Sequence, residues 1–261
     1  MTWAGNSATC TATIKVEQAL DMPPGWTNAD IDNGNGDNYT YGNANGDAGF
    51  APCDGDGGTY TISSMGPSGQ QSDNDQHHSV YKEFCGPAEF IAHLASMEVG
   101  ARAGIEFRES TDEESARLAL KIWRPGVNQF MIIREYRPST GAPLQTAVFP
   151  VLASHNWLRI VRTVNPFNGF QTYSLWTSSD GQTWQPPNFF LAGVVKPQWN
   201  DCLLAAMSVS GTTPFQTRSA TFDGVQLLMS GGGMQAFTPE TGVETETVQA
   251  RQLSVYPNPA G

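Results

Sequence analysis

The chain has 261 residues, a formal net charge of −11 and a charged fraction of only 15%. An acidic chain without a Lys/Arg cluster excludes nucleic acid as a partner, because phosphate binding depends on neutralising cations. No apolar run reaches the roughly 18 residues that cross a bilayer as a helix. The 27 glycines and 7 tryptophans are typical of short strands joined by tight turns, so we expect an all-β chain.

Residues 1–22 form an N-terminal extension, in which the alternation over 9–17 predicts an added edge strand. The segment from Asp30 to Gly58 is rich in Asp, Asn and Gly. Its carboxylates Asp30, Asp32 and Asp37 are candidate ligands for Ca²⁺, which prefers oxygen donors. The complete calcium-loop pattern is missing, so a solvated, turn-rich loop without an ion is the alternative that we favour.

Four cysteines in an acidic, Gly- and Asn-rich chain indicate an oxidising, extracellular setting. Four cysteines allow three pairings. If residues 59–65 and 79–84 form a hairpin, Cys53 and Cys85 fall at the same end of it. We therefore predict the pairs Cys53–Cys85 and Cys10–Cys202, with free buried thiols as the alternative.

The stretch 102–110 alternates apolar and polar residues with the two-residue period of a strand. A polar turn at 111–113 joins it to a second strand at 114–123, and this hairpin is predicted to lie in the middle of a sheet. Residues 90–97 are apolar on both faces, which predicts another central strand. Further strands are predicted at 59–65, 80–84, 127–136, 144–152, 157–164, 170–177, 202–209 and 219–229.

The stretch Ala103–Ser110, AGIEFRES, is similar to a strand of bacterial concanavalin A-like, laminin-G-like jelly-roll modules. The stretches 24–31, 58–64, 157–162, 178–184 and 220–225 resemble further stretches of that family in the right order. The resemblance covers residues 23–229. It implies an antiparallel, two-sheet jelly-roll sandwich that serves secreted proteins as a non-catalytic, often carbohydrate-related module.

After residue 229 the sequence changes character. Residues 230–252 are polar, acidic and Gly-rich at their start, which predicts a flexible linker. Residues 253–261, LSVYPNPAG, resemble the start of the C-terminal sorting domain of the Bacteroidetes type IX secretion system. The resemblance implies export by that system to the cell surface or medium, and a sorting domain cut just after it begins.

Three functions remain in view. The leading hypothesis is a binding module for carbohydrate, which outward aromatic and planar polar side chains of one sheet would hold; the candidates are Glu106, Arg108, Trp123, Arg134, Arg159, Tyr173 and Trp176. We expect Trp157 and Trp184 to pack in the core instead, and Glu106 with Arg108 could equally form an ion-pair lattice without a ligand.

The second hypothesis is a structural or adhesive surface protein that contacts copies of itself or a parent protein. The third is a glycoside hydrolase. We disfavour it because the paired-carboxylate pattern Glu-x-Asp-x-x-Glu, which sets two carboxyls at catalytic spacing on one strand, is absent from the sequence.

Overall fold

The computed structural model describes residues 22–32, 45–52, 57–66, 75–187, 194–196, 199–213 and 215–229. Over these ranges the chain forms fourteen β-strands in two seven-stranded sheets. Neighbouring strands pair antiparallel throughout both sheets. All described residues belong to one compact unit that spans 1–231.

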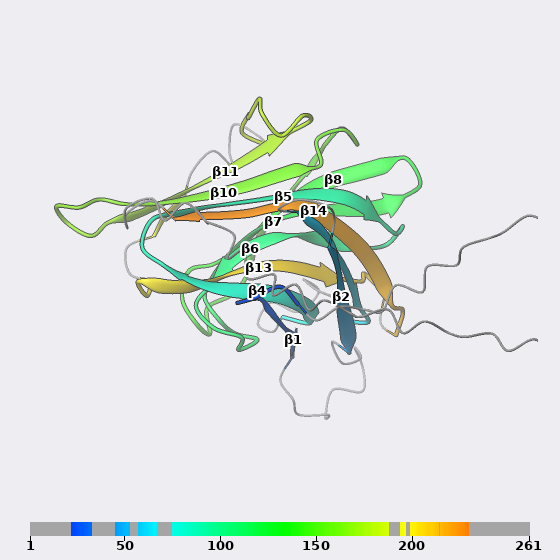
Figure 1. Ribbon diagram of the computed structural model, residues 1–261, viewed down its shortest axis with the longest axis horizontal. Helices are drawn as coiled ribbons and strands as arrows, with labels where there is room; N and C mark the ends of the chain where they lie inside the picture. Colours follow the sequence, from blue (N-terminus) through cyan, green and yellow to red (C-terminus); the bar gives the residue numbers. More distant parts are fainter. Residues whose placement is uncertain are drawn as a thin grey trace, which may run out of the picture. The chain divides into compact units, whose positions relative to one another are not determined.

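We name each sheet after its central strand. In sheet order, the β6 sheet consists of β1 (Thr27–Ile31), β4 (His77–Cys85), β13 (Cys202–Ser210), β6 (Arg102–Arg108), β7 (Arg117–Gly126), β8 (Gln129–Arg137) and β9 (Gln145–Pro150). The β5 sheet consists of β12 (Val194–Lys196), β11 (Gln171–Ser178), β10 (Trp157–Val164), β5 (Ala88–Met97), β14 (Arg218–Met229), β3 (Gly58–Ser64) and β2 (Gly46–Pro52). Figure 1 shows β10, β11 and β5 in one layer and β6 and β13 in the other.

The inner faces of the two sheets form the hydrophobic core. Because successive side chains of a strand point to opposite faces, alternate residues of the central strands enter this space. Phe107 of β6 stacks on Phe90 of β5, with ring centroids 6.2 Å apart, and also meets Phe84 at 4.7 Å. The two central strands are thus joined through aromatic rings that are fully buried.

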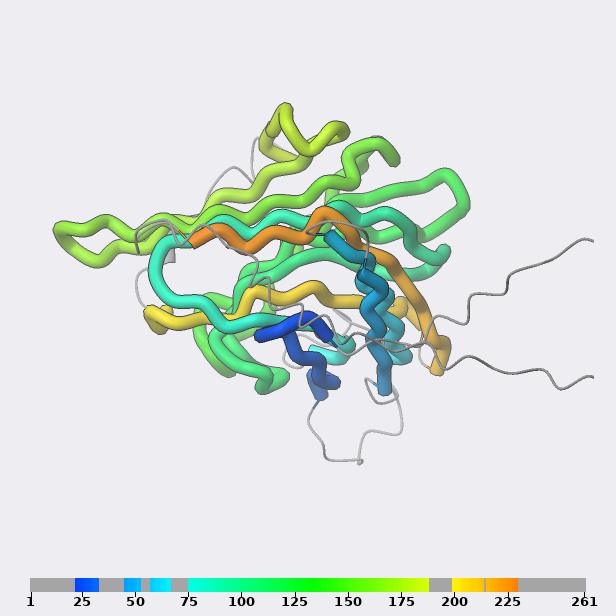
Figure 2. The backbone as a smooth tube through the Cα atoms, viewed as in Figure 1, coloured from blue at the N-terminus to red at the C-terminus, as the bar shows by residue number. Residues whose placement is uncertain are grey.

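The predicted fold class is confirmed: the chain is an antiparallel two-sheet β-sandwich. The strands predicted to be central are central, since β6 and β5 are each the fourth of seven in their sheets. Figure 2 shows how β10 and β11 continue as one long hairpin beyond the ends of the neighbouring strands.

The predicted disulfide pairing is wrong. Cys85 is bonded to Cys202, across 117 residues of sequence. The hairpin on which the prediction depended does not form, because β3 lies in the β5 sheet while β4 lies in the β6 sheet. Instead β4 pairs with β13, which sets Cys85 opposite Cys202 with their Cα atoms 4.0 Å apart.

Several predictions fall outside the described residues: the edge strand at 9–17, Cys10, Cys53, Asp37, the linker at 230–252 and the sorting-domain segment at 253–261. They stay predictions, as do the domain boundaries. The described part of the chain contains no helix with the length and apolar character needed to cross a membrane.

Candidate functional site

The outer face of the β6 sheet carries a cluster of buried charges, which we call the sealed face. Its centre is Glu106 on β6 and Glu135 on β8, with β7 between them. Arg117 of β7 donates to Glu106 at 2.9 Å and lies 3.0 Å from Glu135. Lys121, four residues further along β7 on the same side, lies 3.7 Å from Glu106 and 3.2 Å from Glu135. All four side chains are essentially inaccessible to solvent.

One end of this face is closed by residues that do not belong to its strands. Asp75, just before β4, accepts from Arg137 at 2.9 and 3.1 Å and lies 2.9 Å from Arg117. The amide of Asp75 donates to the carbonyl of Glu113, which lies in the β6–β7 loop. The segment before β4 and this loop therefore meet and cover the guanidinium groups.

The electrostatics of the sealed face keep its carboxyls ionised. Burial alone would raise the pKa of Glu106, but contacts with His77, Lys121 and Arg108 outweigh it and hold that pKa well below its usual value. Burial opposes ionisation of Glu135 too, yet Lys121 and Arg117 lower its pKa to about 2. Burial lowers the pKa of His77 to about 4, against the attraction of Glu106.

These values bear on glycoside hydrolysis. That reaction needs one carboxyl that is protonated near neutral pH and can give its proton to the leaving group. Glu106 and Glu135 share a face, but both are ion-paired carboxylates without a proton to donate. The sealed face has the form of a structural ion-pair network, which was the alternative left open for Glu106 and Arg108.

The outer face of the β5 sheet is different, and we call it the open face. Trp157 of β10 stacks on His93 of β5 with ring centroids 4.7 Å apart and an interplanar angle of 21°. The side-chain amide of Asn156 donates to Nε2 of His93 at 2.9 Å. Nδ1 of His93 forms a hydrogen bond with the carboxylate of Asp223 on β14 at 2.6 Å. Trp157 stays half-buried, so this cluster reaches the surface.

Two glycines hold the Trp157 ring in place. Gly181 and Gly224 both have positive φ, at +70° and +56°. A Cβ at Gly181 would come within 2.9 Å of the Trp157 ring, and one at Gly224 within 2.7 Å. Only glycine allows both the backbone conformation and this close approach.

The next row of the open face lies one pleat along. Trp176 of β11 is the register partner of Arg159 on β10. Arg159 forms a bidentate pair with Glu89 of β5, at 2.7 and 2.8 Å, and its guanidinium lies 5.3 Å from the ring centroid of Trp184. Trp176, Trp184 and Arg159 are all half-buried, so their edges and faces remain accessible.

The seven predicted binding residues do not share one sheet, and that part of the prediction is wrong. Glu106, Arg108 and Trp123 lie on the outer side of the β6 sheet, where Glu106 and Arg108 are fully buried. Arg159 and Trp176 lie on the open face.

Arg134 and Tyr173 lie on the inner sides of their sheets. Arg134 shares its side of β8 with Ile132, and Tyr173 shares its side of β11 with Leu175. Tyr173 is fully buried, and burial raises the pKa of its hydroxyl, which donates to Gln171 at 2.8 Å. The parity of the strand explains the error, because Tyr173 and Trp176 are three residues apart and cannot face the same way.

The expectation that Trp157 and Trp184 pack in the core is also wrong. Trp157 alternates with the inward residues Leu158 and Ile160, so it must point outward. Trp184 follows β11 in a loop that Asp180 organises by accepting from the amides of Gln182 and Thr183. The alternation over 157–162 was the sequence signal that could have placed Trp157 outside.

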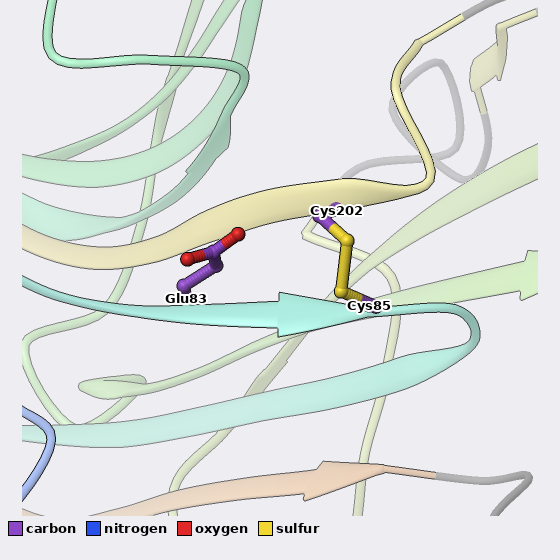
Figure 3. A group of neighbouring side chains, drawn as sticks. All are labelled: Glu83, Cys85 and Cys202. Atoms are coloured by element: carbon purple, nitrogen blue, oxygen red, sulfur yellow. A yellow bond between two sulfur atoms is a disulfide. The ribbon is translucent and has the colours of Figure 1, made fainter.

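The predicted calcium ligands are only partly described. Nδ1 of His78 forms a hydrogen bond with the carboxylate of Asp30 at 2.8 Å. The pKa of Glu113 is raised by burial first, then by the negative charge of Glu114 and then by that of Asp32. Among the described residues, the one close group of potential metal ligands is Glu83, Cys85 and Cys202 (Figure 3). Both sulfurs are bonded to each other, so no thiolate is free to bind a metal.

No protein-family model and no curated protein sequence matches the chain. Among solved structures, it is similar to a β-glucanase of Bacillus licheniformis, with 12% identity, a TM-score of 0.45, and coverage of 81% of this chain and 96% of that one. It is also similar to a legume lectin-like domain from Entamoeba histolytica, with 10% identity, a TM-score of 0.39, and coverage of 72% and 91%.

A third similar structure is the CBM2 module of the evolved Dit of Lactobacillus casei BL23 phage J-1, with 12% identity, a TM-score of 0.35, and coverage of 81% and 94%. With identities this low and TM-scores below 0.5, these likenesses carry no argument about ligand or activity. The fold class rests on the two antiparallel sheets themselves.

Proposed function

We propose that this chain is a non-catalytic carbohydrate-binding module and that it binds through the open face. The observation that carries the proposal is the row of half-exposed tryptophans, Trp176 and Trp184 beside Arg159, on the one outer face that is not closed by its own ion pairs. Aromatic faces stack on the C–H faces of sugars, and planar polar groups beside them bond hydroxyls.

The charges of the open face favour a neutral glycan. Glu89 neutralises Arg159 through two contacts, and His93 is bonded to Asp223. The cationic group of Arg159 is therefore already paired and is not free for an acidic polysaccharide. The net charge of −11 would repel such a polymer as well.

The non-catalytic part of the proposal is supported by the ionised state of Glu106 and Glu135. Both carboxyls that approach each other on the sealed face have lowered pKa values, and both are buried. The general acid of a hydrolase is a carboxyl of raised pKa in contact with substrate, a role that neither Glu106 nor Glu135 can take.

The test is binding of the whole chain to soluble neutral polysaccharides (β-glucan, xylan and mannan), with alginate as the acidic comparison, measured by affinity electrophoresis and calorimetry. We expect Trp176→Ala to weaken binding about tenfold or more, because aromatic anchors dominate such surfaces. Trp123→Ala is the matched control, since it removes a half-buried tryptophan from the other sheet.

Three results would contradict the proposal. They are binding to none of the polymers, loss of binding in Trp123→Ala but not in Trp176→Ala, and release of reducing sugar by the purified chain. Circular dichroism of each variant establishes that it is folded before its binding is compared.

A second candidate function, a structural or adhesive role, is supported by the tip of the β10–β11 hairpin. Phe167 is 96% exposed there and Phe170 is 51% exposed. The turn is held by Asn165 and Asn168, whose side chains accept from the amides of Phe167 and Phe170. Concentration-dependent assembly that Phe167→Ser abolishes, without glycan binding, would favour this role.

We further propose that the chain works outside the cell. The Cys85–Cys202 disulfide is consistent with an oxidising compartment. Export by a type IX secretion system stays a prediction from residues 253–261, which the structure does not describe.

A further inference from the structure

A cavity of about 260 Å³ is lined by residues of β5, β7 and β8 and by Ala153 and Asn156, which precede β10. Its walls are Leu94 and Met97 of β5, Ile122 of β7 and Phe130 of β8, all of which belong to or pack against the core. Exposed residues Ala95, Ser96 and Ala153 continue the lining towards the surface. The space is about nine water volumes, which suits a molecule of roughly ten non-hydrogen atoms.

Irregular strand pairing flanks this cavity on both sides. In β5, Leu94 pairs with Phe222 and Ser96 with Thr221, which leaves Ala95 as an extra residue. In β7, the register with β8 shifts between Trp123 and Gly126. Bulges of this kind bend a strand and redirect its side chains, and they are frequent beside binding sites.

Arg124, within the second irregularity, is the only cation in the lining. Its guanidinium donates to the carbonyls of Met97 at 2.6 Å and Val127 at 3.1 Å and lies 5.4 Å from the ring centroid of Phe130. Within the described ranges no carboxylate lies at ion-pair distance from it. Its Nε–H is buried and has no hydrogen-bond acceptor.

Arg124 therefore differs from the buried arginines of the sealed face. Arg108, Arg117 and Arg137 each have a carboxylate partner. A guanidinium that is fixed by two carbonyls, has no carboxylate partner and lines a cavity is preorganised for an anionic acceptor. The lining joins the apolar side chains of Leu94, Met97, Ile122 and Phe130 to the polar groups of Ser96, Asn156 and Arg124. A ligand that matches it combines an apolar body with a polar or charged end.

We propose that this cavity binds a small monocarboxylate with an apolar body, whose carboxylate meets Arg124 and whose body lies among Leu94, Met97, Ile122 and Phe130. The cavity shares Asn156 with the His93–Trp157 cluster of the open face, but Trp176, Trp184 and Arg159 do not line it. Failure of either proposal therefore leaves the other standing.

The test uses the whole chain, 3-phenylpropanoate as the probe and 3-phenylpropan-1-ol as its uncharged control. Binding is followed by calorimetry and by NMR shifts of the Leu94, Met97 and Ile122 methyl groups. We expect the acid to bind about tenfold or more tightly than the alcohol, which is the size of one charge-assisted hydrogen bond. Arg124→Met keeps the apolar stem and should remove this preference, whereas Arg124→Lys should retain part of it.

Ala153→Trp fills the exposed end of the cavity without touching Arg124, and it should abolish the methyl shifts with both probes. Ala153→Trp tests whether the probes occupy the cavity even if Arg124→Met does not fold. The proposal is overturned if neither probe binds up to its solubility limit, if acid and alcohol bind equally well, or if Ala153→Trp leaves the methyl shifts unchanged.

Discussion

The two outer faces of the sandwich both carry Glu–Arg pairs, in opposite environments. On the sealed face, Glu106 and Arg117 are 2.9 Å apart and neither side chain has any exposed area. On the open face, Glu89 and Arg159 are 2.7 Å apart and each side chain is 24% exposed. The contact distances are alike, so the difference between the pairs lies in their solvation.

The difference in solvation suits the sealed face to a structural role and the open face to ligand binding. A buried ion pair gives up the hydration of both partners and becomes costly to break, because the remaining charge stays in a medium of low polarity. An exposed pair can exchange its partner for water or for a ligand at little cost. The sealed face thus fixes the β6 sheet with its two covering segments, while the open face stays available to a glycan.

The largest effect is expected from removing one charge of the sealed face. Glu106→Gln leaves Arg117, Lys121 and Arg108 without one of their carboxylates and should lower the free energy of unfolding by about 3–5 kcal/mol. The measurement is equilibrium unfolding in urea, provided the variant is folded in its absence.

Glu89→Gln is the matched control on the open face. The same chemical change beside Arg159 should cost less than about 1 kcal/mol, because water replaces the lost carboxylate. Equal losses of unfolding free energy in Glu106→Gln and Glu89→Gln would show that the two faces do not differ in the strength of their ion pairs.

A smaller effect is expected from acid. The pKa of His77 is about 4 in the folded protein and 6.5 when unperturbed. Between pH 6.5 and pH 4, therefore, His77 is protonated in the unfolded chain but stays neutral in the folded one. The stabilisation is therefore complete above pH 6.5 and is lost as the pH falls towards 4. The loss amounts to at most ~3 kcal/mol, at about 1.4 kcal/mol per pKa unit.

The lowered pKa values of Glu106 and Glu135 act in the same direction but lower on the pH scale, below the unperturbed value of 4.5. Unfolding free energies measured from pH 7 to 4.5 should therefore report mainly on His77 within this cluster. His77→Gln should flatten the decline relative to the unmodified chain. An unchanged slope would show that the sealed face does not respond to acid through this residue.

A smaller loss again is expected when the packing of Trp157 on the open face is disturbed. Gly224→Ala would force a Cβ to within 2.7 Å of Trp157 at a φ of +56°. We expect a loss of about 2 kcal/mol from backbone strain and overpacking together. Thermal unfolding gives the cost, and polysaccharide affinity reports whether Trp157 shapes the binding surface.

Gly169→Ala separates the two causes. Gly169 has a φ of +71° with open space around its Cβ position, so it carries the strain without the clash. A cost near 1 kcal/mol is expected there. If both variants lost the same stability, contact with Trp157 would contribute nothing.

The sequence by itself determined the sandwich and much of its interior. The two-residue alternation around Ile105 and Phe107 identified β6 as central, and the doubly apolar run at 90–97 did the same for β5. Alternation also set which side of β6 carries Glu106 and Arg108, because the direction of a side chain follows from parity along a strand.

Only the tertiary structure decided which strands are neighbours and what covers each face. Cys85 and Cys202 meet because β4 pairs with β13 across 117 residues, a partnership that no local pattern records. Glu106 is buried among partners from other strands, among them His77 of β4, whose Nε2 lies 3.0 Å from its carboxylate. A pattern of residues fixes on which side a side chain lies, whereas its exposure depends on the distant segments that pack above it.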